Sequence, residues 1–213
     1  MHLCDQHGIS ITEFEDIIYI PKVRIMDPTP DELVRIAKYF NLPLDVIVLK
    51  DLRQLHKFDK DQFKMMILDV DGTMTDGGMY FTENGDLIKK YNAKDGIAIK
   101  RKIKEGMQFG IISHGTKLKV VQERAEMLGI QHVHVGPEPK LEILNSWLSK
   151  LNINLSEVVY IGDDVNDLDI MSAVGLTACP GNAVNEIKKL VDIVLHKEGG
   201  DACIRELIDE WLS

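Results

Sequence analysis

Two aspartates two positions apart, Asp69 and Asp71, end a short apolar run and carry the clearest signal of chemistry in this sequence. The run Met65–Leu68 is typical of a buried strand, and Gly72 and Thr73 follow where the chain leaves the sheet. On extended backbone, side chains two positions apart project to the same side. Two carboxylates so close repel each other unless a cation, a shared proton or a phosphoryl group lies between them. For an isolated pair, a polar strand end with a solvated turn is the alternative interpretation.

Three further predicted strands end in polar side chains. In chain order these are Ser113 after strand 108–112, Lys140 shortly after strand 132–135, and Asp163, Asp164 and Asp167 after strand 158–161. Each has an ordinary structural interpretation: Ser113 as a helix cap, Lys140 as a solvated helix residue, and the Asp163 cluster as an acidic first turn favoured by the helix dipole. In a parallel sheet, however, the carboxyl ends of the strands meet at one ligand-binding edge. The convergence of all these groups therefore favours a functional site.

The residue types indicate phosphoryl chemistry. Several carboxylates around one point require a hard divalent cation, and Mg²⁺ with oxygen ligands is the natural choice. An ammonium and a hydroxyl opposite them, from Lys140 and Ser113, suit the oxygens of a phosphoryl group. Asp69 would attack phosphorus and form an aspartyl phosphate. Asp71 would protonate the leaving alkoxide and then deprotonate the water that cleaves the intermediate.

Strand-like and helix-like segments alternate from Lys64 onward, which predicts an α/β fold with a doubly wound parallel sheet and helices on both faces. The predicted strands are 65–68, 108–112, 132–135, 158–161, 176–179 and 193–195, and the predicted helices are 95–104, 118–128, 137–151, 167–174, 184–190 and 202–212. Between the first strand and the first helix, residues 79–91 form two strand-like runs around Asn84-Gly85, a strong β-hairpin signal. The hairpin is expected to act as a flap beside the sheet edge.

The 213 residues suggest one domain at 61–213 and a small helical appendage at 1–60, with a polar linker near 52–62. Within the appendage, residues 31–40 have a helical apolar stripe, and a short helix is expected after Leu44. This part resembles the last helices of phage-repressor-type helix-turn-helix domains, but the recognition-helix region at 10–28 is degraded. Eight Lys and Arg against ten Asp and Glu in residues 1–60 disfavour DNA docking. A dimerisation or packing role is the preferred alternative.

Composition bounds the remaining possibilities. A formal charge of −9 argues against general nucleic-acid binding, while 45% hydrophobic and 28% charged residues are ordinary for a globular protein. No apolar run is long enough to span a membrane and no secretory leader pattern is present, so we expect a cytoplasmic protein without membrane partners. Cys4, Cys179 and Cys203 are too widely spaced to indicate a disulfide framework or a Cys-x-x-Cys metal site.

The motifs together resemble those of the haloacid dehalogenase superfamily. Asp69-Val-Asp-Gly-Thr73 is similar to its first motif, Ser113 to its second, Lys140 to its third, and Gly162-Asp-Asp-Val-Asn-Asp167 to its fourth. The resemblance implies a Rossmann-like phosphatase domain over residues 61–213. It also implies these roles: Asp69 as nucleophile, Asp71 as general acid and base, Ser113 and Lys140 with Gly72 and Thr73 as phosphate-binding residues, Asp69, Asp71 through its carbonyl and Asp163 as Mg²⁺ ligands, and Asp164 or Asp167 as assisting residues.

The gaps between these motifs leave no room for a cap domain beyond the hairpin. This resembles the capless branch of the superfamily, whose homotetramers cover each site with a neighbouring subunit and which includes 3-deoxy-manno-octulosonate (KDO) 8-phosphate phosphatases of lipopolysaccharide biosynthesis. Phosphatases of nine-carbon keto-sugar-acid 9-phosphates, or of broader specificity, are alternatives. A DNA-binding regulator or scaffold that uses the domain as a sensor is the non-enzymatic alternative. One departure is Ser113-His-Gly-Thr-Lys117, which lacks the arginine that the KDO enzymes carry after their second motif.

Overall fold

A computed structural model describes residues 3–4, 8–25, 27–40, 42, 44–49, 60–84, 87–115 and 118–212. The chain divides into two compact units, Met1–Phe58 and Asp59–Ser213. Part of the predicted hairpin turn (Gly85), most of the predicted linker and Lys117 lie outside the described residues.

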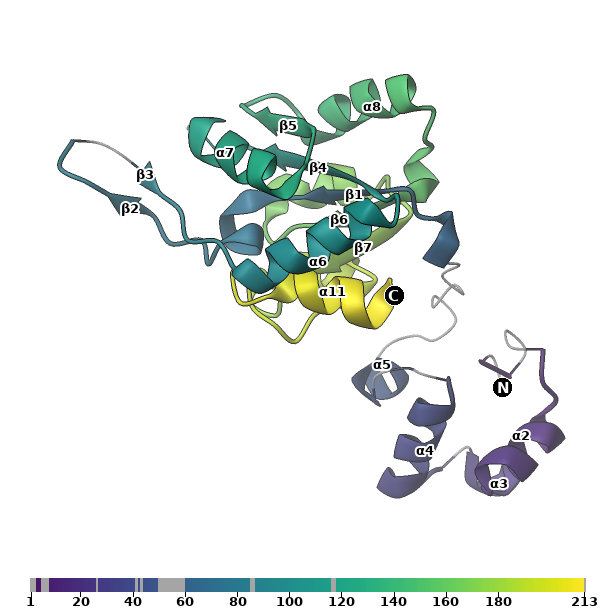
Figure 1. Ribbon diagram of the computed structural model, residues 1–213. Coiled ribbons are helices and arrows are strands. Elements are labelled where there is room, and N and C mark those ends of the chain that lie inside the picture. Colours follow the sequence, from purple (N-terminus) through teal and green to yellow (C-terminus); the bar gives the residue numbers. More distant parts are fainter. Residues whose placement is uncertain are drawn as a thin grey trace. The chain divides into compact units, whose positions relative to one another are not determined.

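In the described part of the second unit, six parallel strands form one sheet in the order β5-β4-β1-β6-β7-β8 (Figure 1). The strands are β1 (Met65–Leu68), β4 (Gln108–Ser113), β5 (His132–Val135), β6 (Val158–Ile161), β7 (Leu176–Cys179) and β8 (Ile193–Val194). The earliest of them, β1, is central because Met65 pairs with Gln108 on one side and Val158 on the other. All four of its residues are buried, which agrees with its unbroken apolar sequence.

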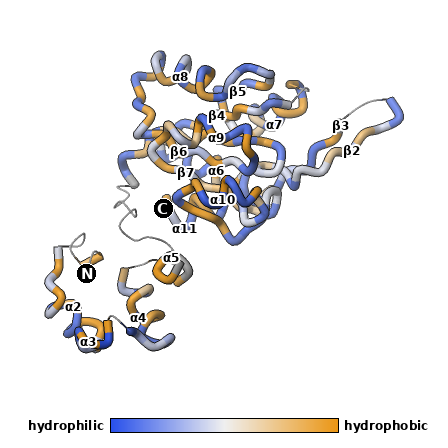
Figure 2. The backbone as a smooth tube through the Cα atoms, turned by 180° about the vertical axis from the view of Figure 1, so that it is seen from behind, coloured by the Kyte–Doolittle hydropathy of each residue, from blue (hydrophilic) through white to orange (hydrophobic). Residues whose placement is uncertain are grey.

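Helices cover both faces of this sheet, as predicted for a doubly wound fold. One face carries α6 (Ala93–Lys104), α7 (Leu118–Leu128) and α11 (Cys203–Trp211), and the other carries α8 (Lys140–Leu151), α9 (Leu168–Met171) and α10 (Asn185–Leu190). Alternate residues of β1 serve the two layers: Met65 and Ile67 pack in the core beneath α8, α9 and α10. Apolar residues gather in the strands and inner helix faces (Figure 2). None of the helices in the described ranges has both the length and the apolar composition of a membrane span.

Several elements are shorter than predicted. The helix predicted from Pro137 begins at Lys140, directly after Pro139. A 3-10 turn at Val165–Asp167 followed by α9 replaces the helix predicted over 167–174. The hairpin has strands of only two residues, β2 (Tyr80–Phe81) and β3 (Leu87–Ile88), and it extends beyond the body of the unit (Figure 1). Short 3-10 turns also lie at Lys60–Gln62 and Leu155–Glu157.

The first unit is a small helical cluster. Within the described residues of this unit lie the helices α2 (Ile11–Ile18), α3 (Lys22–Ile25), α4 (Pro30–Phe40) and α5 (Leu44–Leu49). Phe14 from α2 packs against Tyr39 and Phe40 from α4, with ring centroids 5.2 and 5.0 Å apart. Helix α2 was not among the predicted helices, although a capping box marks its start: Ser10 and Glu13 form reciprocal hydrogen bonds. The likeness of this unit to a helix-turn-helix domain stays a prediction.

Candidate active site

The loop that follows β1 carries the two aspartates of the first motif. The amide of Asp69 donates to the carbonyl of Ile161 at 3.0 Å, so the strand pairing continues to the residue that begins the loop. Gly72 has a φ of 89°, and a methyl group on it would lie 2.0 Å from Oδ2 of Asp163. Glycine is therefore required here both for the left-handed backbone and for the close approach of the Asp163 carboxylate.

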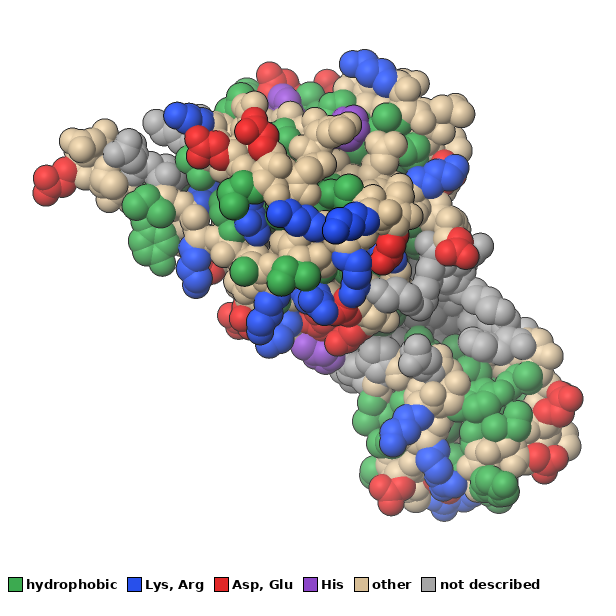
Figure 3. All heavy atoms as spheres, in the orientation of Figure 1, with side chains coloured by type: hydrophobic (Ala, Val, Ile, Leu, Met, Phe, Trp, Pro, Cys, Tyr) green, Lys and Arg blue, Asp and Glu red, His purple; other side chains and the backbone are tan. Residues whose placement is uncertain are grey.

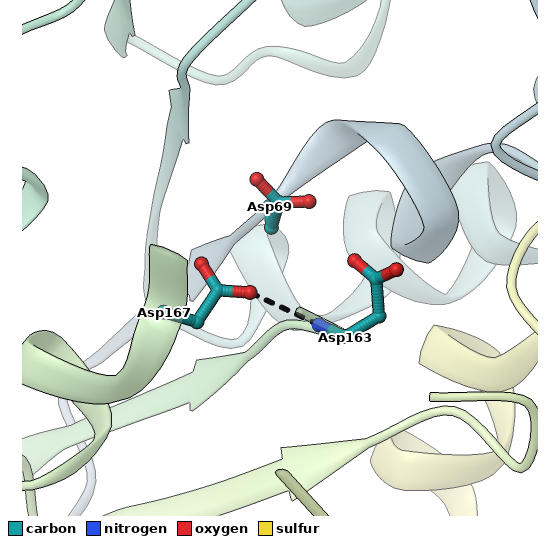
Figure 4. Close-up of side chains that lie close together, drawn as sticks. All are labelled: Asp69, Asp163 and Asp167. Atoms are coloured by element: carbon teal, nitrogen blue, oxygen red, sulfur yellow. Dashed lines mark hydrogen bonds between the residues drawn. The ribbon is translucent and has the colours of Figure 1, made fainter. Parts of the chain in front are cut away.

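Three carboxylates converge at the carboxyl ends of β1 and β6. Asp69, Asp163 and Asp167 each offer an oxygen, and these oxygens lie within 4.8 Å of one another (Figure 4). The closeness follows from topology, because β1 and β6 are neighbouring parallel strands whose ends are level. The sequence thus predicted correctly that residues distant in the chain would meet at this edge.

Lys140 lies in the middle of the same cluster. Its Nζ donates to Oδ1 of Asp69 at 2.6 Å and to Oδ1 of Asp167 at 2.5 Å, and its side chain is almost completely buried. The Tyr160 hydroxyl accepts from Lys140 at 3.2 Å and donates to Oδ1 of Asp167 at 2.6 Å. The sequence analysis placed Tyr160 on a strand but missed this contact. A hydroxyl-bearing residue inside a fully buried strand was the available signal, because such a group needs a hydrogen-bond partner.

Burial governs the protonation of these groups. It raises the pKa of Asp69 to about 8 and that of Asp163 to about 7, and in both cases the neighbouring carboxylate of Asp167 adds to the rise. Burial alone would lower the pKa of Lys140, but Asp69 and Asp167 outweigh it and raise this pKa. Burial also raises the pKa of Tyr160, which keeps its hydroxyl protonated.

The charges of the cluster fit a divalent cation. When all three are ionised, the carboxylates and the one ammonium leave two negative charges uncompensated in a largely buried space, and a bound cation would favour this ionised state. Oxygen ligands alone, with carboxylates as the charged donors, are what Mg²⁺ prefers. Asp69 and Asp163 are the ligands that fit best, because Oδ1 of Asp167 already accepts from Lys140 and Tyr160.

The two residues predicted to assist the metal differ in position. Oδ2 of Asp167 accepts from the amide of Asp163 at 3.0 Å and from that of Asp164 at 3.4 Å, so Asp167 holds the loop that carries Asp163. The side chain of Asp164 is exposed and bonds the amide of Val165 at the start of the 3-10 turn. Of this pair, the structure brings Asp167 and not Asp164 into the carboxylate cluster.

Asp71 stands apart from the three clustered carboxylates. Its Oδ1 forms an ion pair with Nζ of Lys89, a hairpin residue that the sequence analysis did not single out. The Asp71 side chain is 42% exposed, so it can still reach a substrate or water. Oδ2 of Asp71 lies 3.6 Å from the position that a methyl group on Gly115 would take, which places the loop after β4 beside it.

The remaining predicted residues lie around the loop but face different partners. Ser113 is buried at the end of β4, where its Oγ accepts from the amide of Gly115 at 3.1 Å. The hydroxyl of Thr73 is buried and lies 3.4 Å from Oδ1 of Asp163. A methyl group on Gly199 would lie 1.8 Å from the carbonyl oxygen of Gly72, so the Gly199-Gly200 segment packs against the loop of its own chain.

The rim of the site carries a histidine where the arginine is absent. Nε2 of His114 lies 3.1 Å from the carbonyl oxygen of Glu138, and its Nδ1 lies 3.4 Å from Nδ2 of Asn166. The ring thereby links the loops that follow β4, β5 and β6. Among the described residues of these loops, the exposed imidazole of His114 and the amide of Asn166 are polar groups that could contact a leaving group.

Comparison with known proteins gives consistent results. Residues 138–207 match a family described as haloacid dehalogenase-like hydrolases. The 3-deoxy-D-manno-octulosonate 8-phosphate phosphatase of Salmonella typhi is 36% identical over 149 residues, which are 70% of this chain and 79% of that protein. The crystal structure of the corresponding Yersinia pestis phosphatase has a TM-score of 0.69 at 32% identity and covers 71% of this chain and 81% of its own. That from Moraxella catarrhalis, in complex with magnesium ion, phosphate ion and KDO, has a TM-score of 0.67 at 30% identity, covering 70% and 84%.

Proposed function

Since this chain belongs to the haloacid dehalogenase-like hydrolases related to KDO 8-phosphate phosphatase, and is thus a phosphoric monoester hydrolase, we propose that it hydrolyses an acidic sugar phosphate. KDO 8-phosphate is the proposed substrate, and Mg²⁺ the proposed cofactor. The observation that carries the proposal is the buried cluster of Asp69, Asp163, Asp167 and Lys140 at the sheet edge.

In the first half of the proposed reaction, a carboxylate oxygen of Asp69 attacks phosphorus and the bond from phosphorus to the sugar oxygen breaks. Asp71 gives its proton to the leaving oxygen. Lys140 fixes Asp69 through Oδ1, and its positive charge, together with the hydroxyl of Ser113, would stabilise the oxygens of the phosphoryl group. The products of this half are the free sugar and an aspartyl phosphate on Asp69.

In the second half, Asp71 takes a proton from water and the water oxygen attacks phosphorus. The bond between phosphorus and Asp69 breaks, which releases inorganic phosphate and restores the carboxylate. Bound Mg²⁺, held by Asp69, Asp163 and the Asp71 carbonyl, would neutralise charge on the phosphoryl group. The partly exposed position of Asp71 suits both proton transfers, because substrate and water must reach it in turn.

The proposal for which sugar acid is the substrate rests on the proteins to which this chain is similar. Similarity to KDO 8-phosphate phosphatases favours the eight-carbon substrate. Because the sequence lacks the arginine of the KDO enzymes after Ser113, a nine-carbon keto-sugar-acid 9-phosphate, the substrate of other enzymes of the same branch, stays the second candidate.

A phosphate-release screen tests the proposal. Purified protein is assayed with KDO 8-phosphate, a nine-carbon keto-sugar-acid 9-phosphate, neutral hexose phosphates and a phosphopeptide, each with Mg²⁺ and with excess chelator. We expect kcat/KM for the eight-carbon acid to exceed that for the neutral sugars at least tenfold, and turnover to depend on Mg²⁺. Equal rates on all sugar phosphates would replace the proposal by a broad-specificity phosphatase.

We also propose that the active species is a homotetramer. The two-stranded hairpin exposes Met79, Tyr80, Phe81 and Ile88, and a hydrophobic patch lies on it in Figure 3. Such a ribbon is marginally stable alone, and its apolar surface suits packing against other copies. The Gly199-Gly200 segment lies against its own chain, so the hairpin is the element proposed to cover a neighbouring site.

A further inference from the structure

The contact between Lys89 and Asp71 joins the hairpin to the catalytic loop. Lys89 directly follows β3, and its ammonium pairs with Oδ1 of Asp71. The Lys89 side chain is only 5% exposed, although Met79, Tyr80, Phe81 and Ile88 of the same hairpin lie largely in solvent. Asp71 is 42% exposed, so in this ion pair the lysine is shielded from solvent and the carboxylate is accessible to it. A buried lysine side chain loses rotamer freedom, whereas a lysine at the surface keeps it. The burial of Lys89 therefore has an entropic cost, which the contact with Asp71 must offset.

The backbone fixes which lysine reaches the site. Successive side chains of an extended segment point to opposite sides, and the next residue, Lys90, pairs instead with Asp76 at 3.0 Å and is 67% exposed. Tyr91, two residues after Lys89, forms an antiparallel bridge with Thr75. Thr75 is itself tied to the start of the catalytic loop, because its amide and its hydroxyl both donate to the carbonyl of Val70, at 3.0 and 3.1 Å. The hairpin base and the loop that carries Asp71 are therefore one hydrogen-bonded unit.

We propose that Lys89 is a positioning residue for the reaction: its ammonium holds the Asp71 carboxylate in the orientation from which both proton transfers occur. This inference rests on the proposed role of Asp71 as general acid and base. Proton transfer needs a donor and acceptor within hydrogen-bond reach, and a half-exposed aspartate on a loop has several rotamers of similar energy. A charge-assisted hydrogen bond to one oxygen, Oδ1, selects one rotamer and leaves Oδ2 for the substrate oxygen or water.

A double-mutant cycle in the full chain tests this inference. Lys89→Met removes the charge and keeps the buried stem, and it is combined with Asp71→Asn; turnover of KDO 8-phosphate, or of the best substrate found, is measured with Mg²⁺. We expect Lys89→Met to lower kcat about tenfold with KM changed less than about twofold, and Asp71→Asn to lower kcat about 10²- to 10⁴-fold. In the Asp71→Asn background, Lys89→Met should cost less than about twofold, because its partner is gone.

Lys90→Met is the matched control. It removes a charge of the same type from the next residue, whose ion pair with Asp76 is exposed. It should leave kcat and KM within about twofold of wild type. Circular dichroism and melting curves establish that each variant is folded. If Lys89→Met is poorly folded, Lys89→Gln takes its place in the same cycle.

The outcomes separate two failures. If Asp71→Asn retains kcat within tenfold of wild type, the proposed acid and base role of Asp71 fails and the role of Lys89 fails with it. If Asp71→Asn lowers kcat more than tenfold but the effects of the two substitutions multiply, or if Lys89→Met changes KM and not kcat, Lys89 acts independently of Asp71 and only the positioning role is overturned. An unchanged Lys89→Met enzyme overturns it as well.

Discussion

Lys140 gives the site its particular balance of charge. A buried ammonium between Asp69 and Asp167 offsets part of the repulsion among three carboxylates while leaving two charges for a cation. The Tyr160 hydroxyl accepts a hydrogen bond from Lys140 and donates one to Asp167. Lys140 and Asp167 are therefore each oriented by more than one contact. Each of these side chains is thereby held in one position before substrate binds, which is the condition for electrostatic catalysis.

Asp69→Asn should abolish turnover without unfolding the protein. The amide keeps the volume of the side chain but cannot act as the nucleophile and removes one negative charge from the metal site. We expect kcat to fall more than about 10³-fold, measured as phosphate release at saturating Mg²⁺. Secondary structure measured by circular dichroism should be unchanged, and residual activity within tenfold of wild type would contradict the nucleophile assignment.

The sequence could predict the members of this site that end strands, but not those that orient them. Asp69, Ser113 and Asp163 were identifiable because parallel strands bring their carboxyl ends together. Tyr160 and Lys89 were not, because the direction of a side chain on a strand or hairpin depends on register, which local sequence does not determine. The sequence also left Asp164 and Asp167 equivalent, and the 3-10 turn between them decides that Asp167 faces inward.

At the scale of elements, α6 and α11 are joined because a side chain of α6 caps the N-terminus of α11. The N-cap residue of α11, Ala202, offers no capping side chain, and Oδ1 of Asp95 in α6 accepts from the amide of Arg205 at 2.8 Å instead. Oδ2 of Asp95 is buried and has no hydrogen-bond partner among the described residues. Burial raises the pKa of this carboxyl from 3.8 to about 6. The cap thus stabilises the helix start while its ionised form remains costly.

This cap should make stability depend on pH. Because the folded-state pKa of Asp95 lies above the unfolded value, the proton on Asp95 stabilises the folded protein below pH 4, and that stabilisation is lost as the pH rises through about 6. Asp95→Asn cannot titrate, so its free energy of unfolding relative to wild type should rise by about 2 to 3 kcal/mol between pH 4 and pH 7. Urea unfolding of both proteins at several pH values measures this difference. Parallel curves for the two proteins would rule the effect out.

At the scale of the whole molecule, the hairpin is anchored at its base and exposes apolar side chains further out. Its base is tied down where the guanidinium of Arg124 lies over the Tyr91 ring at 5.3 Å and donates to the carbonyl of Asn92 at 3.0 Å. Its outer part carries Phe81 and Ile88, 63% and 55% exposed. A firm base with exposed apolar side chains on its strands is suited to contacting another copy of the chain.

Charges on that ribbon should break up the assembly. Phe81→Glu with Ile88→Lys is expected to give smaller species in sedimentation velocity, with unchanged circular dichroism and a KM raised several-fold, because the wall of each site would be lost. Glu83→Lys, an exposed charge change in the same hairpin, should leave the assembly intact. A fully active wild-type monomer at working concentration would contradict both the tetramer and the covering role of the hairpin.

Length and composition suggested a division of the chain near residue 60, and the structure separates Met1–Phe58 from Asp59–Ser213. The helical stripe of residues 31–40 was readable because its apolar residues recur with helical period, and α4 covers Pro30–Phe40. The role of the first unit could not be read in the same way. Its packed residues, such as Phe14 and Phe40, explain why it folds and carry no information about a partner.

The central position of β1 has a consequence for the order in which the enzyme becomes active during synthesis. Asp69 leaves the ribosome long before Gln108 and Val158, the starts of the strands that flank β1, and before Lys140, Asp163 and Asp167, which share its charge cluster. Pairings of such long range form late, after the intervening chain is available. Until then Asp69, the proposed nucleophile, has neither the ammonium of Lys140 nor the other carboxylates of the proposed metal site. A nascent chain that ends before Asp167 therefore carries the attacking residue without the means to use it.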